Sequence, residues 1–600
     1  MKTTNLSAIT QQLSLLALQS AHQNQHPTTQ TLRAELALLL QTLQLLYPKI
    51  SAPEAQPSEL AEEAFVSKLS LALQRFLFAG ALRAKEFQQL QQALSLQREP
   101  TPEALSLHAR EARELLQSFV PKELAAVWAK YPPEVLAVLV SQDEAERVSA
   151  LASLGVQNAA EFLPRLGRLP IDEGSARWLQ SLSQSPDPES SLRWLLSLLE
   201  TPFGLSYYNF FSRHEPWSLA VLRLTGLSEA LSRLLLRSLE LAEAVFLQAS
   251  FGGPKTQVKS VEALRVWQRQ EQLRIILAWL YKTLTLYDTQ RQLSLLAETC
   301  VTRCFDEALL EDGAQHSGQA PRLAVIALGS LGAYEMLYQS DVDLMFFSDG
   351  DPDTDERCTK IVQRTIALLT AKRDEGSLYE VDTRLRPLGT QGPLVVSAQG
   401  WSRYFGLSES EGSRAHLWEE QALLRARTIT GDAGLRAAFS ALQQQALRRP
   451  RVAQVVVDEV RQMRQKIESE VPRHRRFYYK ASSGGLQDID FLVQSLQLTH
   501  GDKRPELLSP TTHQSLTLLS DAGLLSTEDA SLLLSAHERW LTLTLLTRLL
   551  VEKNLDCIPE DSNALRRALG ESKNYSEDSF QKQLELLRVQ VRACFDRIVH

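Results

Sequence analysis

Three aspartates in the middle of the 600-residue chain have the spacing that metal-assisted nucleotidyl transfer requires. Asp341 and Asp343 are separated by one residue at the start of the run DVDLMFF, which reads as a buried strand. Because side chains alternate along a strand, both carboxylates point to one face, roughly 6–7 Å apart. Two carboxylates at that spacing can hold a pair of Mg²⁺ ions, which prefer oxygen ligands and leave room for substrate phosphates. Asp382, on a neighbouring predicted strand, can supply a third carboxylate.

Candidate phosphate-binding residues lie close to the aspartates in the sequence. Gly329 and Ser330 follow a short apolar run at a predicted strand-to-helix turn, where free N–H groups and the helix dipole can receive a phosphate. Arg384 and Arg386 follow Asp382 at positions i+2 and i+4, so the three side chains should share one face of a strand. Two arginines beside a metal-binding aspartate would suit the negative charge of a nucleoside triphosphate such as ATP.

An Asp-x-Asp pair alone is a weak signal, and the chain carries others. The DPDTD run at 351–355 lies in a polar loop that contains proline, and the DID run at 488–490 lies in a predicted helix, where residues i and i+2 diverge. Asp341 and Asp343 differ because a strand, a Gly-Ser turn and a helix precede them and the strand of Asp382 follows.

Other polar residues near these motifs each allow two interpretations. The basic and aromatic run RHRRFYYK at 473–480 either contacts ATP phosphates or an acidic partner, or forms a solvated loop. Arg425 and Arg427 either bind phosphate or form ordinary salt bridges. Asp488 and Asp490 either bond nucleotide or peptide groups or have a structural role.

The elements that must position these residues form one small α/β domain in an otherwise helical chain. Helical periodicity fills the first 300 residues or so, where Asp187-Pro188-Glu189 has the form of a helix start, and it resumes from Val452. Strands are predicted at 322–328, 341–347 and 379–388, with helices at 331–338 and 358–369. We therefore expect an α+β, mostly α-helical fold, with helical regions at 1–185 and 186–305, the α/β domain at 306–440 and a C-terminal helical domain at 441–600.

Composition excludes several other classes of protein. With 44% hydrophobic and 22% charged residues, the chain can bury cores, which excludes wholesale disorder. The net charge of −7 disfavours nucleic acid as the main partner. No apolar run approaches the roughly 18 residues that span a bilayer, so no membrane partner is expected. Five cysteines without a CxxC pair indicate a reduced, cytoplasmic protein without a zinc site.

Four blocks of sequence resemble, in order, the motifs of glutamine synthetase adenylyltransferases, which are also called glutamate-ammonia ligase adenylyltransferases. Residues 329–344 (GSLGAYEMLYQSDVDL) align without a gap to the family pattern G-K-L-G-G-x-E-L-x-x-x-S-D-x-D-L. Residues 378–387 (LYEVDTRLRP), 418–427 (WEEQALLRAR) and 484–491 (GGLQDIDF) supply the other three blocks. The similarity covers roughly residues 190–600. It implies a small DNA polymerase β-like nucleotidyltransferase domain between helical domains.

The resemblance also implies an activity and partners. Family members transfer AMP from ATP to a tyrosine of glutamine synthetase and so regulate nitrogen assimilation, which here implies two Mg²⁺ ions and ATP at the aspartates, turn and arginines identified above. A PII-type signal protein is a candidate second partner. The usual member carries two catalytic units, one that adds AMP and one that removes it by phosphorolysis. One Asp-x-Asp unit is present here, and the blocks at 378–387 and 418–427 look more like the adenylylating half. Removal of AMP, or a catalytically silent regulator that binds glutamine synthetase or a PII-type protein, are the alternatives.

Three departures from the family pattern concern the candidate site and the later DID block. Ser330 replaces the usual lysine, Ala333 replaces the second glycine, and Asp490 stands where glutamate is usual. All three departures leave the three carboxylates intact.

Overall fold

The computed structural model describes most of the chain from residue 131 to residue 599. The gaps within that range are 142, 171–172, 203, 213–214, 240–257, 259, 317–320, 352–353, 374–375, 408–412, 472–476, 560 and 571–575. The predictions that lie partly outside the described residues include the helical region 1–185, of which 1–130 is not described, and the basic run, of which 473–476 is not described. The chain forms two compact units, Met1–Leu222 and Arg223–His600.

The described part of the first unit is helical. Its helices are α7 (Pro133–Val140), α8 (Glu144–Ser153), η1 (Ala159–Phe162), α9 (Leu163–Leu166), α10 (Glu173–Leu182), α11 (Pro188–Leu199), α12 (Gly204–Ser212) and the start of α13 (Glu215–Leu227). The predicted helix start at Asp187 is confirmed, because its side chain accepts hydrogen bonds from the N–H groups of Glu189 and Ser190. Leucine and aromatic side chains form much of the core, with the rings of Trp178 and Trp194 stacked 6.3 Å apart.

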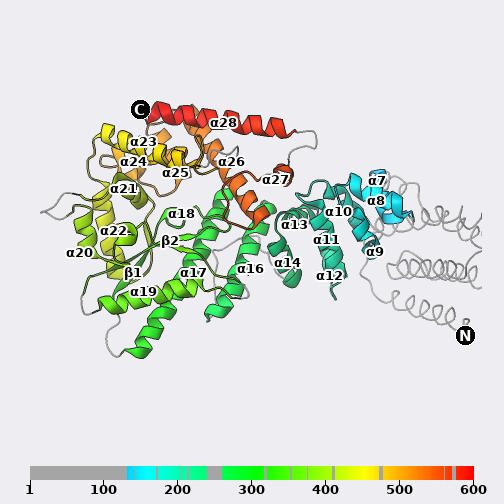
Figure 1. Cartoon of the computed structure of the whole chain (residues 1–600), viewed down its shortest axis with the longest axis horizontal. Helices are drawn as coiled ribbons and strands as arrows, with labels where there is room; N and C mark the ends of the chain where they lie inside the picture. The colour runs from blue at the N-terminus through cyan, green and yellow to red at the C-terminus, as the bar shows by residue number, and fades with distance from the viewer. Residues whose placement is uncertain are drawn as a thin grey trace, which may run out of the picture. The chain divides into compact units, whose positions relative to one another are not determined.

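The second unit begins with helices and then forms the predicted sheet (Figure 1). Helices α14 (Glu229–Arg237), α16 (Val261–Leu280) and α17 (Leu286–Gln315) precede it. The strands are β1 (Leu323–Ala327), β2 (Val342–Ser348), β3 (Val381–Asp382), β4 (Val395–Ser397) and β5 (Arg427–Gly431), in the order β3-β2-β1-β5, with β4 also paired to β2. Strand β1 is antiparallel to β2 and β5, whereas β3 and β4 run parallel to β2.

The alternation of side chains along β2 places Asp343 relative to the core. Val342, Leu344 and Phe346 join the hydrophobic cluster that α17 and α19 (Asp355–Thr370) build on one face of the sheet. Phe347 points to the other face, where its ring lies 5.4 Å from that of Phe439 in α22 (Ala433–Leu447). Asp343 lies four residues before Phe347 and therefore on the same face of the strand, so its carboxylate stays out of the apolar cluster.

The predicted elements are confirmed in part. The strands at 322–328 and 341–347 correspond to β1 and β2, and the helix at 358–369 lies within α19. The helix at 331–338 is wrong, because α18 (Gly329–Gly332) is a single turn and Tyr334 adopts a left-handed backbone conformation with φ +59°. The strand at 379–388 is also wrong beyond Asp382, since the side chain of Asp382 accepts a hydrogen bond from the N–H of Arg384 and turns the chain.

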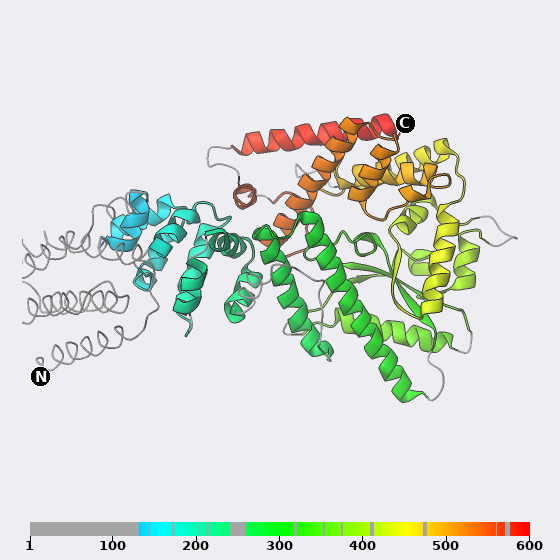
Figure 2. The same cartoon turned by 180° about the vertical axis from the view of Figure 1, so that it is seen from behind.

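Helices follow the sheet to the end of the described chain, and Figure 2 shows them from behind. Alongside α22, they are α20 (Ala398–Tyr404), α21 (Leu417–Leu424), α23 (Ala453–Glu470), α24 (Leu486–His500), α25 (Thr512–Asp521), α26 (Thr527–Val551), α27 (Asn563–Ala568) and α28 (Glu577–Ile598). Short 3₁₀ turns, η2 (Gly389–Gln391) and η3 (Pro505–Leu507), complete the described elements. The predicted α+β, mostly helical fold class is confirmed. None of the helices in the described part of the chain is long and apolar enough to cross a membrane.

Candidate active site

The turn between β1 and α18 brings the chain against the carboxylate of Asp343. The N–H of Leu328 donates to the carbonyl of Asp343 at 3.0 Å, and Gly329 follows with a φ of +53°. A Cβ atom at position 329 would lie 2.1 Å from Oδ2 of Asp343. Glycine is therefore required here twice, for its backbone conformation and for the close approach of the carboxylate.

Two of the predicted catalytic aspartates lie side by side on neighbouring strands. Asp343 and Asp382 are register partners in the parallel pair of β2 and β3, and Asp341 precedes β2 by one residue. Burial, followed by the charge of Asp341, raises the pKa of Asp343 to about 7, and the charge of Asp382 acts in the same direction. The structure thus gathers negative charge at the start of β2.

The carboxylate of Asp382 is held by Arg384. Arg384 donates to it through the backbone N–H at 2.8 Å and through Nε at 2.8 Å to Oδ2, and these hydrogen bonds lower the pKa of Asp382. The Arg384 side chain is 75% exposed, so it can leave Asp382 without any loss of packing. Within the described residues, no three His, Cys, Asp or Glu side chains are arranged to hold a metal ion.

The expected common face of Asp382, Arg384 and Arg386 is wrong, because β3 ends at Asp382. Arg386 is instead buried inside the loop that follows. Its guanidinium donates to the carbonyls of Thr383 at 2.6 Å, Pro393 at 2.9 Å and Gly392 at 3.2 Å. The observed contacts of Arg386 brace this loop, and a contact of Arg386 with nucleotide stays a prediction.

A buried polar network joins the sheet domain to the C-terminal helices. Arg425 donates to Asp490 at 2.6 Å, forms an ion pair with Glu335 at 3.2 Å and donates to the hydroxyl of Thr512 at 2.7 Å. The N–H of Thr512 in turn donates to Glu335 at 2.6 Å. Asp490 is one methylene shorter than the family's glutamate and still reaches Arg425. Of the two interpretations of Arg425, the structure shows the salt bridge.

Arg427 and Asp488 also have structural contacts. Arg427 donates to Glu298 at 2.6 Å and to the carbonyls of Leu331 and Gly332, both at 3.2 Å, so it holds the end of α18. Asp488 is fully buried, forms an ion pair with Arg464 and accepts a hydrogen bond from the N–H of Gly484 at 2.7 Å. Such pairs could not be found from the sequence, because each joins residues from different elements.

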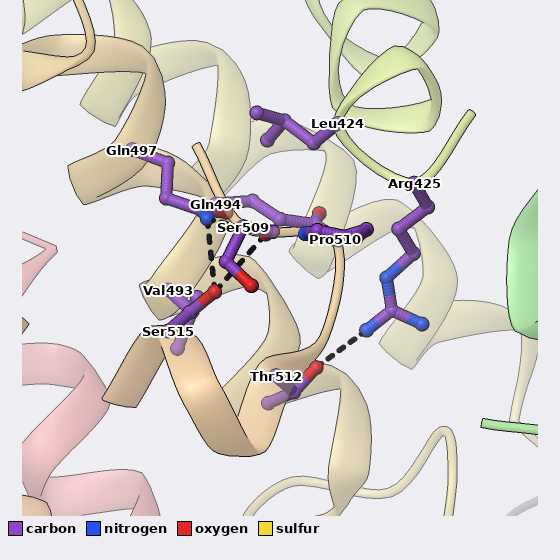
Figure 3. Close-up of a pocket in the computed structure, with 9 residues that line it drawn as sticks. All are labelled: Leu424, Arg425, Val493, Gln494, Gln497, Ser509, Pro510, Thr512 and Ser515. Carbon is purple, nitrogen blue, oxygen red and sulfur yellow. Dashed lines mark hydrogen bonds between the residues drawn. The ribbon is translucent and has the colours of Figure 1, made fainter. Parts of the chain in front are cut away.

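A pocket beside Arg425 is distinct from the carboxylate cluster (Figure 3). Its lining groups bond to one another: Gln497 donates to the Ser515 hydroxyl at 2.9 Å, and Arg425 donates to Thr512. The lining of this pocket is therefore a polar contact between α24, the start of α25 and the end of α21.

Comparison with known families agrees with this arrangement. Residues 225–442 match the family model of glutamate-ammonia ligase adenylyltransferase, and residues 461–599 match that of GlnD PII-uridylyltransferase. The first match contains the Gly329 turn, all three aspartates and Arg384. The resemblance predicted from the motifs is thereby confirmed over residues 225–442, which are similar to the glutamate-ammonia ligase adenylyltransferase family.

Proposed function

We propose that this chain transfers AMP from ATP to a tyrosine of glutamine synthetase in the cytoplasm. The register pairing of Asp343 with Asp382, with Gly329 closed against the Asp343 carboxylate, carries the proposal. The match of residues 225–442 to the adenylyltransferase family supports the choice of AMP and of this target.

The residue types suit a divalent cation, although the three carboxylates are not arranged around a metal position in this structure. Asp341, Asp343 and Asp382 offer hard carboxylate oxygens, and the pKa of Asp343 is raised first by burial and then by neighbouring negative charge, which a cation would neutralise. In our proposal these three residues hold two Mg²⁺ ions, which would offset the charge of the triphosphate and lower the pKa of the attacking hydroxyl.

The chain's own residues then supply binding and proton transfer. A tyrosine hydroxyl has an ordinary pKa of about 10 and must lose its proton to attack the α-phosphorus. Asp382 can accept this proton, since an aspartate carboxyl is ionised near neutral pH. When Arg384 binds the triphosphate instead of Asp382, the Asp382 carboxylate is released as the substrate binds. Gly329 and Ser330 form the turn against which the triphosphate would lie.

The C-terminal match favours one second candidate. Because residues 461–599 resemble a PII-uridylyltransferase, the donor could be UTP and the acceptor a PII-type protein. The same site could also run in reverse, with inorganic phosphate attacking tyrosyl-AMP, or could be a silent regulator that only binds these partners.

One experiment distinguishes these functions. The full-length chain is incubated with Mg²⁺ and either ATP plus glutamine synthetase, UTP plus a PII-type protein, or phosphate plus adenylylated glutamine synthetase. Each acceptor is then analysed by intact-mass spectrometry, with Asp343→Asn as the matched inactive control. Gain of AMP by glutamine synthetase that is faster than its loss with phosphate supports the proposal. Faster loss would reverse the direction, UMP on the PII-type protein would replace the donor and target, and no reaction in any arm would favour the silent regulator.

A further inference from the structure

A segment of the C-terminal helices is tied directly to the chain that precedes the catalytic aspartates. Arg548, a buried residue of α26, donates to the hydroxyl of Ser340 at 2.9 Å and to the carbonyl of Tyr338 at 3.3 Å. The same guanidinium donates to Asp556 at 2.6 and 3.0 Å. Since Ser340 is the neighbour of Asp341, Arg548 fixes the segment around Asp556 beside the entrance to β2.

The segment around Asp556 in turn fixes the loop that begins at residue 477. The carbonyl of Asp556 accepts a hydrogen bond from the N–H of Tyr479 at 2.7 Å, and the N–H of Ile558 donates to the carbonyl of Phe477 at 3.1 Å. These bonds run on either side of an antiparallel bridge between Tyr478 and Cys557. Lys480 is the next residue along the loop.

The far side of this loop is also held by the protein interior. Arg464 donates to the carbonyls of Ala481 and Ser482, both at 2.9 Å, and pairs with the buried Asp488 of α24. The carbonyl of Lys480 accepts a hydrogen bond from the N–H of Gln487 at 3.0 Å. The backbone of Lys480 is therefore fixed from both sides.

The side chain of Lys480, in contrast, is exposed and forms no salt bridge with the described residues. Its positive charge acts on Asp343. It lowers the pKa of that carboxyl, whereas burial and the charge of Asp341 raise it. The charge of Arg384 has the same effect on the pKa of Asp343. A backbone that is held by hydrogen bonds, with an exposed ammonium group whose charge acts on Asp343, is a suitable arrangement for capturing a phosphate that arrives with its metal.

We propose that Lys480, contributed by the C-terminal helical domain, binds the pyrophosphate portion of ATP and so completes the active site. This inference rests on the proposed function. In the reaction, the tyrosine oxygen forms a bond to the α-phosphorus, the bond from that phosphorus to the bridging oxygen breaks, and pyrophosphate leaves while Asp382 takes the tyrosine proton. The α-phosphate must lie at the aspartates where the target attacks, so the β- and γ-phosphates extend beyond them and can be met by Lys480.

The test compares three variants of the full-length chain by calorimetric titration with ATP, AMP and pyrophosphate in the presence of Mg²⁺. Lys480→Gln removes the charge, Lys480→Arg keeps it, and Lys466→Gln removes the charge of another exposed lysine, on α23. We expect Lys480→Gln to weaken ATP and pyrophosphate binding roughly tenfold to a hundredfold, the range of a charge-assisted hydrogen bond, and to leave AMP binding unchanged. Lys480→Arg should recover most of the affinity, and Lys466→Gln should match the wild type.

The outcomes separate this inference from the function on which it rests. Because the Lys480 side chain is exposed, the thermal unfolding midpoint of Lys480→Gln should equal that of the wild type, so that loss of binding cannot come from misfolding. If Lys480→Gln binds ATP as tightly as the wild type, or loses AMP and ATP equally, the role of Lys480 is refuted and the proposed function stands. If the wild type itself binds neither ATP nor pyrophosphate, the proposed function is refuted and this inference with it.

Discussion

Metal-free protein in which Asp343 is replaced by asparagine should resist urea better than the wild type at alkaline pH, although it should no longer transfer AMP. The pKa of Asp343 is raised from its ordinary 3.8 to about 7, so the folded protein binds this proton more tightly than the unfolded chain does. The ionised carboxylate therefore destabilises the fold. This penalty is absent below about pH 4, grows as the pH rises, and is complete above about pH 7.

The magnitude follows from the same shift. About three pKa units at about 1.4 kcal/mol each give a ceiling of about 4 kcal/mol in the free energy of unfolding. Because Asp343 is only partly buried and solvent screens its charge, we expect a gain of about 1–3 kcal/mol for Asp343→Asn at pH 8. The gain should shrink to near zero at about pH 4.5, where the wild-type side chain is largely protonated in the folded state.

The assay is urea unfolding of both proteins in the presence of a chelator at the two pH values. Asp349→Asn is the matched control, since Asp349 follows the same strand and is exposed, and its substitution should change stability by less than about 0.5 kcal/mol. Adding Mg²⁺ should stabilise the wild type by mass action and Asp343→Asn much less. A variant less stable than the wild type at pH 8, or a difference independent of pH, would refute the crowded-carboxylate account.

Three further predictions test the surroundings of the site. Arg464→Ala should lower the free energy of unfolding in urea by about 3 kcal/mol, because it leaves the buried carboxylate of Asp488 without its main partner. Arg588→Ala, the control at a more exposed ion pair, should lower it by less than about 1 kcal/mol, and equal losses would contradict this prediction. Gly329→Ala should abolish AMP transfer, because its Cβ would lie 2.1 Å from a carboxylate oxygen on β2, while Gly570→Ala, also at positive φ but in open space, should retain transfer; an active Gly329→Ala would disprove the close approach. Burial lowers the pKa of His537 to about 4, so the unfolded chain takes up its proton first and stability should fall as the pH drops from about 6.5 to about 4; His537→Gln should flatten this slope, and an unchanged slope would count against it.

The sequence predicted the central strands because their signals are local. The runs at β1 and β2 are apolar and rich in β-branched or aromatic residues, which predicts buried strands. Both strands are almost completely buried. The Gly-Ser turn and the two register-paired aspartates follow from these strands. The prediction of a longer strand after Asp382 is wrong, although polar and apolar residues do alternate in this stretch. An Asp382 side chain that bonds the backbone two residues later ends the strand, and alternation does not reveal such a turn.

The parts of the site that the sequence could not reveal depend on contacts between distant residues. Arg548 lies more than 200 positions from Ser340, and nothing in the sequence around either indicates that they meet. Lys480 stood in a basic run that reads equally well as a solvated loop. Its relation to the aspartates becomes visible only when the bonds through Asp556 place the loop. Arg386 matches a phosphate-binding pattern in the sequence, yet its guanidinium donates hydrogen bonds to the carbonyls of its own loop.

The central claim, that the Asp343 site transfers a nucleotidyl group to protein, is tested most directly by stoichiometry in a single reaction. The full-length chain is mixed with ATP, Mg²⁺ and unmodified glutamine synthetase, and released pyrophosphate and AMP bound to the target are measured over the same time course. We predict one pyrophosphate released for each AMP attached to a tyrosine, and neither product with Asp343→Asn. Pyrophosphate without attached AMP, or equal transfer by the wild type and Asp343→Asn, would contradict the account.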